Sequence, residues 1–546
     1  MTLKILIVNR FSPLLFLLIP FFYKIIILRP NKYIKRFNKR FKFFHILKIY
    51  FLENLKTKDN DNLDIKAREE LATRLSKKNV NFDIKNFLDN FLDIENSEFF
   101  LKKSIFHYLF LLDYFKTIKF FNKKKYIFFN LVENDISKIL KIKSILKKNL
   151  LLNYFDYLYK IFFLINLKFN YNKSTKNITK NFKIATEVSN FKFFNKKIGE
   201  PNFLDLKNTI YYVTEKKNID GLLKNNSSPV KKISNIIDLR FIKPEIIFWK
   251  KFVSSIKRVP NFSSYDPNFF KIFFSQYNSY NNLHLYVKNI EYHLIIESSN
   301  DLRLINLEGP LAKFLSKINS SKLISYQTRC PYIFDPLSFF SFYDYFFSWS
   351  NFWFNKKNFR AEKIFYGSPF IQKRNFFSNN KSISFFPAEI NDSIHCSKKY
   401  FLKFFNFAIK LSNKYKNYNF YFKMKYRGQF NANELDYILP TNFKLLDYTD
   451  NNEKLILNSN IVVSQSFTSP GFYALGLGIK SIILSHLDIS NEKLKNLPIV
   501  YQYNEKFFQD FYNYLLNKNL NVFFKTKKKI FSEKDLKKTI LNFLNV

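Results

Sequence analysis

Hydroxyl side chains and glycines gather near the C-terminus, in the stretch SQSFTSPGFYALGLGIKSIIL. The chain has only 8 glycines in 546 residues, and three of them, Gly471, Gly476 and Gly478, fall here. The residue order predicts a buried strand, a hydroxyl-rich loop, and a short helix capped by Ser469 with proline in its first turn. Gly476 and Gly478 suit the positive-φ position that ends such a helix.

A strand that runs through a hydroxyl-rich loop into a helix N-terminus offers N–H and O–H donors to an anion. In an open parallel sheet this turn lies at the carboxyl edge, where ligands bind. The candidate phosphate ligands are Ser464, Ser466, Thr468, Ser469 and Gly471. The alternative is an ordinary strand-to-helix turn, which favours the same residue types.

A basic strand end precedes this loop in the chain. Lys423, Lys425 and Arg427 alternate along the segment YFKMKYRG, so they share one face if the segment is extended. A guanidinium and two ammonium groups at a strand end predict a clamp on a diphosphate. An exposed face of an edge strand is the alternative.

Short apolar runs alternate with helical patterns after about residue 285, which predicts an α/β fold with parallel sheets. The expected strands are His293–Glu297, Leu302–Leu307, Lys322–Gln327, Tyr343–Ser348, Lys363–Tyr366, Ser382–Phe386, Asn419–Lys423, Phe443–Asp447, Ile461–Ser464 and Ser481–Ser485. The expected helices are Lys398–Lys414, Glu505–Leu516 and Glu533–Phe543, besides the short helix after Ser469. We expect an N-terminal Rossmann-like domain over 1–355, with a helical or irregular region inserted at about 50–285, and a C-terminal nucleotide-binding domain over 356–546.

The N-terminus carries the most apolar segment. Its uninterrupted run from Pro13 to Tyr23 is shorter than the roughly 20 residues a spanning helix needs. No small-residue cleavage site of a signal peptide follows it. We therefore expect strand Leu3–Val8, a short helix after Ser12, and strand Lys24–Leu28, the opening β-α-β of a Rossmann-type domain. A segment that skims a membrane surface is the alternative.

The formal net charge of +46 arises mostly from lysine, since only 13 of the 89 basic residues are arginine. Abundant Phe, Lys, Asn, Ile and Tyr indicate a coding bias toward AT-rich codons, and dispersed lysine disfavours nucleic acid as the partner. An anionic membrane surface is the better match, so a peripheral location at the inner membrane face is expected. Two cysteines without a disulfide pattern favour a reducing compartment, so the expected location is cytoplasmic. Two cysteines without a CxxC pattern and six unclustered histidines predict neither disulfides nor a metal site, and no cofactor is expected.

The order of these features over about 340–490 resembles the nucleotide-binding half of GT-B glycosyltransferases. The resemblance is to capsule and surface-polysaccharide biosynthesis proteins and the related glycerophosphate polymerases. It rests on YDYFFSW from Tyr343, KIFYGSP from Lys363, the basic strand Phe420–Arg427, and the hydroxyl turn Ser464–Leu484. It implies two Rossmann-like domains, a nucleotide-sugar donor, and a polysaccharide or lipid-linked acceptor. It also implies a metal-independent transfer.

The chain departs from that family at two places. The family's His-Gly after the strand at Lys322–Gln327 is replaced by Thr328-Arg329-Cys330, and the His-Pro of the basic strand by Tyr426-Arg427. The catalytic base is therefore unassigned, with Glu308, Asp335 and Asp344 as candidate carboxylates and His486 and Asp488 as candidate sugar or nucleotide contacts. Two alternatives stay open, a GT-B scaffold that binds without catalysis and a basic, non-enzymatic protein that associates with membranes or nucleic acid.

Overall fold

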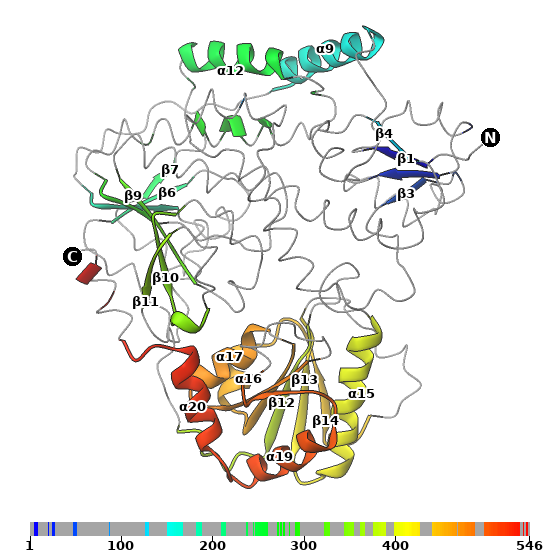
Figure 1. Ribbon diagram of the computed structural model, residues 1–546, viewed down its shortest axis with the longest axis vertical. Coiled ribbons are helices and arrows are strands. Elements are labelled where there is room, and N and C mark those ends of the chain that lie inside the picture. The colour runs from blue at the N-terminus through cyan, green and yellow to red at the C-terminus, as the bar shows by residue number, and fades with distance from the viewer. Residues whose placement is uncertain are drawn as a thin grey trace.

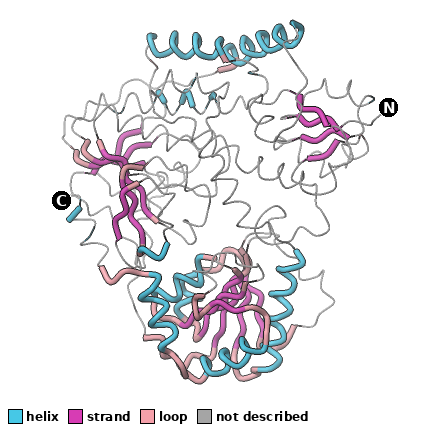
Figure 2. The backbone as a smooth tube through the Cα atoms, viewed as in Figure 1, coloured by secondary structure: helices cyan, strands magenta, loops and turns pink. Residues whose placement is uncertain are grey.

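The computed structural model of this protein consists of parallel β-sheets with helices packed on them (Figures 1 and 2). It describes residues 5–8, 24–27, 49–51, 126–129, 150–167, 182–187, 209–213, 236–238, 246–259, 290–294, 321–327, 343–353, 361–365, 375–388, 398–425, 439–466, 468–485 and 496–534. A few single positions complete the described part: 20, 47, 87, 244, 262, 270, 271, 273–275, 277, 278, 283, 539, 542 and 543.

Among the described residues the strands form three sheets. The four-stranded sheet has the order β3-β2-β1-β4, with β1 Ile5–Val8, β2 Lys24–Ile27, β3 Ile49–Phe51 and β4 Tyr126–Phe129. The seven-stranded sheet has the order β11-β10-β9-β8-β5-β6-β7, with β5 Ile184–Glu187, β6 Thr209–Val213, β7 Ile236–Asp238, β8 Tyr292–Leu294, β9 Lys322–Tyr326, β10 Tyr345–Ser348 and β11 Glu362–Phe365. The six-stranded sheet has the order β14-β13-β12-β15-β16-β17, with β12 Ser382–Phe386, β13 Asn419–Lys423, β14 Phe443–Leu446, β15 Ile461–Gln465, β16 Lys480–Leu484 and β17 Val500–Tyr501.

Each sheet follows the same path. The chain enters an inner strand, adds two strands on one side, and then crosses over to build the other side, with parallel pairing throughout. This is the order of a Rossmann-type sheet, whose ligands bind where the direction of winding reverses. The expected α/β class with parallel sheets is therefore confirmed.

The helices fall into two groups. Next to the six-stranded sheet lie α15 Lys398–Lys414, α16 Asn452–Leu457, α17 Ser469–Gly476, α19 Glu505–Leu515 and α20 Asn521–Ile530 (Figure 1). Away from it lie α9 Leu150–Ile165 and α12 Ile246–Arg258, and the 3-10 helix η9 Asn351–Trp353 follows β10. Among the helices that the structure describes, none combines the length and apolarity needed to cross a bilayer.

Sequence patterns located the elements of the last sheet closely. The predicted bounds of β12, α15 and β13 agree with the structure, those of β14, β15 and α19 differ by one residue at one end, and those of β16 are shifted by one residue at both ends. Strands were also confirmed at β1, β2, β8, β9 and β10. The predicted strand 302–307, the helix after Ser12 and the terminal helix 533–543 lie wholly or largely outside the described residues.

Two expectations about organisation need correction. The strand near Lys363 was expected to open the C-terminal domain, but β11 pairs in parallel with β10 and belongs to the seven-stranded sheet. The region 50–285 was expected to be an insertion, yet its strands β5, β6 and β7 are neighbouring strands of that sheet. Their runs are short and lie between polar segments, so a single sequence carries little pattern to reveal them. The division of the chain into an N-terminal and a C-terminal domain stays a prediction.

Phenylalanine builds the core of the six-stranded sheet. Phe422 on β13 lies at the centre, with ring centroids of Phe405 at 5.0 Å and of Phe401 and Phe404 at 5.7 Å. All four side chains are fully buried, and the three α15 rings recur at three- and four-residue spacing. The predicted helix Lys398–Lys414 thus packs on the sheet through this apolar stripe. Edge-to-face ring contacts of this kind add to the burial of apolar area.

The segment after α20 returns toward the seven-stranded sheet. The Trp353 indole N–H and the Ser350 hydroxyl donate to the Ile530 carbonyl at 2.9 and 2.7 Å, and Ser532 N–H donates to the Trp349 carbonyl at 2.7 Å. The ring of Phe543 then packs 4.8 Å from that of Tyr345 on β10. The third sheet's last helix is thus tied to the end of β10.

A buried lysine makes stability depend on pH. Lys480 is fully buried and donates to the Tyr514 carbonyl and to Asn517 Oδ1 at 2.6 and 2.8 Å. Burial lowers its pKa from 10.5 to about 7, and burial lowers the pKa of Lys527 to about 8. Between those values and 10.5 the unfolded chain binds more protons than the folded one. Stability should therefore rise as pH rises from 7 toward 10 and be lost as pH falls back to 7.

Thermal unfolding across pH 7–10 tests this expectation. Lys480→Met should flatten the rise, whereas Lys518→Met, at an exposed site near the same end of the sheet, should leave its slope unchanged. Equal slopes for wild type and Lys480→Met would contradict the assignment.

Candidate functional site

The six-stranded sheet reverses its winding between β12 and β15, and one side chain spans that point. Gln465, the last residue of β15, is fully buried. Its Oε1 accepts from Ala388 N–H at 3.0 Å, and its Nε2 donates to the Tyr400 carbonyl at 3.0 Å. The amide thus joins β15 both to the chain leaving β12 and to the first turn of α15. Ligands of open α/β sheets bind at this kind of position.

Strand register places two of the predicted ligands on one face of the sheet. Phe386 on β12 pairs with Ser464 on β15. On the other side of β12, Phe385 pairs with Phe422 on β13, so the next residue, Lys423, is level with Phe386. Lys423, Phe386 and Ser464 therefore form one row across three neighbouring strands. Residues in one row of a parallel sheet project to the same side. Lys423 and Ser464 therefore share the face that α17 covers and lie two strand spacings apart, about 10 Å.

The predicted ligands Ser464 and Gly471 pack against each other. Both are buried, and a Cβ added to Gly471 would lie 2.4 Å from Ser464 Oγ and 3.2 Å from Ser481 Oγ. Glycine thus allows α17 to lie close on β15 and β16. Neither hydroxyl has a hydrogen-bond partner among the described residues. Packing is the role seen for Gly471, and phosphate contact by Ser464 and Gly471 stays a prediction.

The turn between β15 and α17 differs from the expected cap. The cap position is Thr468, in extended conformation and without a side-chain cap hydrogen bond, while Ser469 occupies the first helical position and Pro470 the second. The Thr468 hydroxyl oxygen is buried without a partner among the described residues. Ser466 adopts a positive φ of 51°, a backbone conformation that costs a non-glycine residue about 1 kcal/mol or more. Strained backbone of this kind concentrates at ligand sites.

The start of α17 favours an anion. Its first turn contains no acidic residue, and the first N–H groups of a helix have no intrahelical acceptor. The C-terminal end of α17 is capped by backbone hydrogen bonds. Gly478 has φ 77°, its N–H donates to the Leu475 carbonyl, and Ile479 N–H donates to the Ala474 carbonyl. Lys527 Nζ donates to the Gly476 carbonyl at 3.0 Å, which suits the negative end of the helix dipole. The expectation that a positive-φ glycine ends this helix is confirmed at Gly478.

The two lysines at the basic strand end differ in how far they are buried. Lys423 is only 3% exposed, and its Nζ donates to the Met424 carbonyl at 3.0 Å. Burial lowers the pKa of Lys423, while the fields of Asp450 and Asp447 act in the opposite direction. Lys425 is exposed, so the two lysines differ in environment despite their alternation. Arg427 lies outside the described residues.

A buried ammonium with one carbonyl partner retains two N–H donors for a ligand. Ionisable groups perturbed by burial at a ligand edge are candidates for function.

The candidate carboxylates give no catalytic base. Asp344 precedes β10, at the amino ends of the strands, and its Oδ2 accepts from Leu323 N–H at 2.8 Å. It thus orders the start of two strands at the edge opposite to the one where ligands bind. Glu308, Asp335, His486 and Asp488 lie outside the described residues. Within the described part of the chain, no group of three His, Cys, Asp or Glu side chains is placed to hold a metal ion.

Sequence reasoning missed Gln465. The residue stands between the apolar run of β15 and the hydroxyl loop, where a polar residue signals only the end of a strand. Its two partners are 77 and 65 positions away in the chain, so no local pattern reveals the contacts.

No family model matches the sequence, and no curated protein is similar to it at a significant level. Solved structures share a distant likeness. MurG from Acinetobacter baumannii is 10% identical with a TM-score of 0.37, over 66% of this chain and 99% of that one. UDP-GlcNAc 2-epimerase from Neisseria meningitidis, bound to UDP-GlcNAc, is 13% identical with a TM-score of 0.39, over 67% and 99%. The glycosyltransferase SnogD from Streptomyces nogalater is 9% identical with a TM-score of 0.39, over 67% and 100%.

Proposed function

We propose that this protein is a GT-B glycosyltransferase that moves a sugar from a nucleotide-sugar donor to a surface-polysaccharide or lipid-linked acceptor. The observation that carries the proposal is the carboxyl edge of the six-stranded sheet. There the acid-free N-terminus of α17 and the buried Lys423 lie on one face, beside the reversal point at Gln465. The ordered resemblance of residues 340–490 to polysaccharide-synthesis enzymes supports the donor and acceptor classes.

In this proposal the six-stranded sheet holds the donor diphosphate. The bond between the anomeric carbon and the phosphate oxygen breaks, and negative charge develops on the departing diphosphate. N–H groups at the start of α17, the hydroxyls of Thr468 and Ser469, and the Lys423 ammonium would stabilise that charge. Lys425 and Arg427 would extend the basic rim. Fixed donors of this kind supply the stabilisation without a metal ion.

The acceptor hydroxyl then bonds to the anomeric carbon and gives its proton to a base. We place the acceptor on the side of the seven-stranded sheet and propose a peripheral, cytoplasmic-face enzyme.

Lys423→Met tests the site. The substitution keeps an unbranched apolar stem that matches the lysine carbons but removes the ammonium, so the affinity for nucleoside diphosphates should fall by about tenfold or more, the range for a lost charge-assisted hydrogen bond. Thermal stability should be unchanged or higher, because the cost of burying the charge is removed. Calorimetric titration with UDP, GDP and CDP measures the effect.

Lys444→Met is the matched control, since Lys444 is exposed on the neighbouring strand β14. It should bind nucleotide as wild type does. Equal affinity for Lys423→Met and wild type would remove Lys423 from the site. A uniform response to every polyanion, without preference for one nucleotide, would overturn the enzyme proposal.

A further inference from the structure

Helix α9 has the reverse of the usual distribution of side chains. Its two charged residues, Asp156 and Lys160, are buried, whereas Tyr154 and Phe162 are each 62% exposed and Ile165 is 71% exposed. Exposed Tyr157 and half-buried Leu158 continue the same outer side. A helix that packs on a core in water places its apolar stripe inward and its charges outward. The outer side of α9 is therefore built for contact with something other than water.

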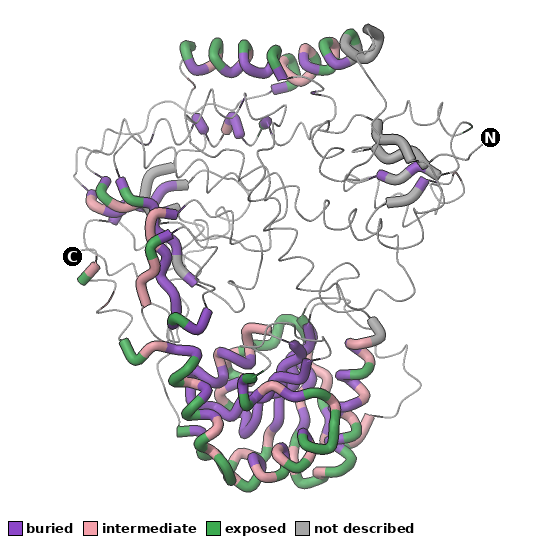
Figure 3. The backbone as a smooth tube through the Cα atoms, viewed as in Figure 1, coloured by how far each residue is buried: buried purple, intermediate pink, exposed green. Residues whose placement is uncertain are grey.

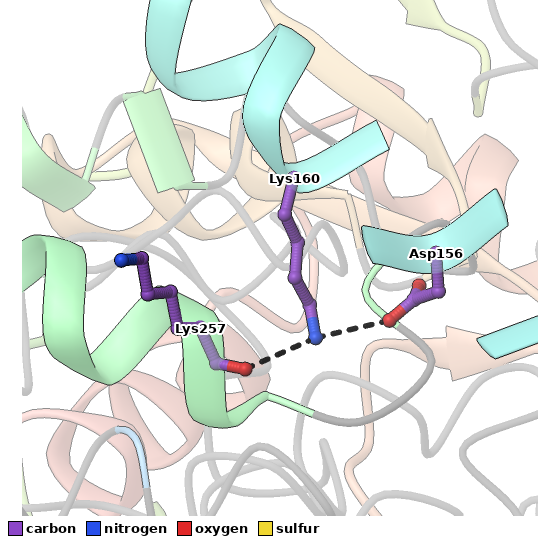
Figure 4. A network of polar contacts seen from close by, with 3 residues as sticks. All are labelled: Asp156, Lys160 and Lys257. Atoms are coloured by element: carbon purple, nitrogen blue, oxygen red, sulfur yellow. Dashed lines mark hydrogen bonds and ion pairs between the residues drawn. The ribbon is translucent and has the colours of Figure 1, made fainter. Parts of the chain in front are cut away.

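The buried charges fix the orientation of α9. Lys160 Nζ lies 3.0 Å from Asp156 Oδ2 one turn earlier and donates to the Lys257 carbonyl near the end of α12 at 3.2 Å (Figure 4). A cation at the C-terminal end of α12 is favourable for that helix. On the same inner side, the ring of Phe163 packs 5.1 Å from that of Phe262. Turning α9 to bury its apolar side would break this paired, hydrogen-bonded arrangement.

Helix α12 continues this surface and adds positive charge. Ile246 and Ile247 are 71% and 78% exposed, and Lys250, Lys257 and Arg258 are exposed along the same helix. Its inner side is filled by Phe248 and Phe252, which pack on a layer of further phenylalanines. Figure 3 shows exposed positions on the outer sides of both helices, at the top of the view, and buried positions on the sides facing the molecule. Among the described residues of α9 and α12, no acidic side chain is exposed.

We propose that the outer sides of α9 and α12 dock on an anionic lipid bilayer. The apolar part of this outer face is Tyr154, Tyr157, Phe162, Ile165, Ile246 and Ile247, and its basic part is Lys250, Lys257 and Arg258. Helices that lie in a membrane interface insert large apolar side chains at the boundary and direct lysine and arginine to the headgroups. Tyrosine suits the same depth, with an apolar ring and a polar tip. The complementary charge of anionic headgroups favours lipid over a second, equally basic copy of this chain.

The docking surface goes beyond the proposed catalytic function and does not depend on it. It lies on elements separate from the six-stranded sheet, so failure of lipid binding would leave the nucleotide site untouched. If both proposals hold, docking would bring the enzyme to a lipid-linked acceptor.

Vesicle flotation of the full chain tests docking directly. Wild type should float with phosphatidylcholine vesicles that contain phosphatidylglycerol, and much less with phosphatidylcholine alone. The triple variant Tyr157→Ser, Phe162→Ser, Ile165→Ser should lose flotation with both. The triple variant Lys250→Gln, Lys257→Gln, Arg258→Gln should lose roughly tenfold or more of its affinity for the anionic vesicles, since each cation near such a surface contributes to binding.

A matched control removes exposed apolar residues elsewhere. Phe377→Ser, Tyr512→Ser, Leu516→Ser alters three side chains that are exposed on the part of the chain around the six-stranded sheet. This variant should float as wild type does. Thermal unfolding of all variants checks that each is folded.

Tryptophan fluorescence provides a second measurement on the unmodified protein. Of the three tryptophans, Trp349 and Trp353 are fully buried, while Trp249 is half-buried on α12. A blue shift with anionic vesicles should therefore come from Trp249 and vanish in Trp249→Phe. Flotation of the apolar triple variant at the wild-type level would overturn the proposal. So would a wild-type dimer that this variant converts to monomer while neither binds vesicles, which would make the face a contact between two copies.

Discussion

Gly471→Ala is expected to destabilise the protein by about 1–3 kcal/mol, the range for overpacking a closely packed interior. The added methyl would lie 2.4 Å from Ser464 Oγ and 3.2 Å from both Ser464 Cβ and Ser481 Oγ. Ser464 Cβ is fixed by the backbone of the buried strand β15, and the two hydroxyls can move only by changing their χ1 rotamers inside a closely packed interface. Helix α17 must then move off the sheet. Chemical denaturation of wild type and variant measures the loss.

Removal of the obstructing hydroxyl should reverse part of that loss. Ser464→Ala alone should be close to neutral or stabilising, because its buried hydroxyl has no hydrogen-bond partner among the described residues. In the Gly471→Ala background it removes the 2.4 Å contact, so the double variant should be more stable than Gly471→Ala. A double variant as unstable as the glycine variant would show that Ser464 is not the obstacle.

The same displacement should affect the proposed function. If the start of α17 holds the donor diphosphate, Gly471→Ala should weaken nucleotide binding, and the double variant should recover it together with stability. Recovery of stability without recovery of binding would separate the packing role of Gly471 from a role in ligand contact.

Gln465→Met is expected to cost about 2–4 kcal/mol, because it leaves a buried N–H and a buried carbonyl without their partner. Methionine matches glutamine in length but neither accepts from Ala388 N–H nor donates to the Tyr400 carbonyl. The expected result is a lower denaturation midpoint and faster hydrogen exchange at the Ala388 amide. The junction of β12, β15 and α15 should loosen, and nucleotide affinity should fall with it.

Gln502→Met is the matched control for this substitution, since Gln502 is exposed just after β17. It should change stability by no more than about 0.5 kcal/mol, as expected at a surface position. A similar midpoint for both glutamine variants would mean that the bridge of Gln465 does not hold the junction together.

Local patterns sufficed where neighbouring residues determine the structure. The stripe Phe401, Phe404, Phe405 located α15 and its buried side, and Ser382–Phe386 located β12. The same reasoning missed α16, α20 and β17. The helix α16 spans only six residues, and its best signal is Asn451, whose side chain accepts from Glu453 and Lys454 N–H. β17 has two residues, too few to show a period.

The sequence by itself determined the α/β class, the strands from β12 to β16 with the helix α15, and the helix end at Gly478, because these follow from the period of apolar residues and the backbone freedom of glycine. Tertiary structure decided the features that depend on contacts between elements far apart in the chain. It paired β11 with β10, and it buried Lys423 while leaving Lys425 exposed. It also brought Gly471 into close contact with Ser464. It also turned the charges of α9 inward and its aromatic side chains outward, since the period of a helix shows which residues share a side but not which side meets the core.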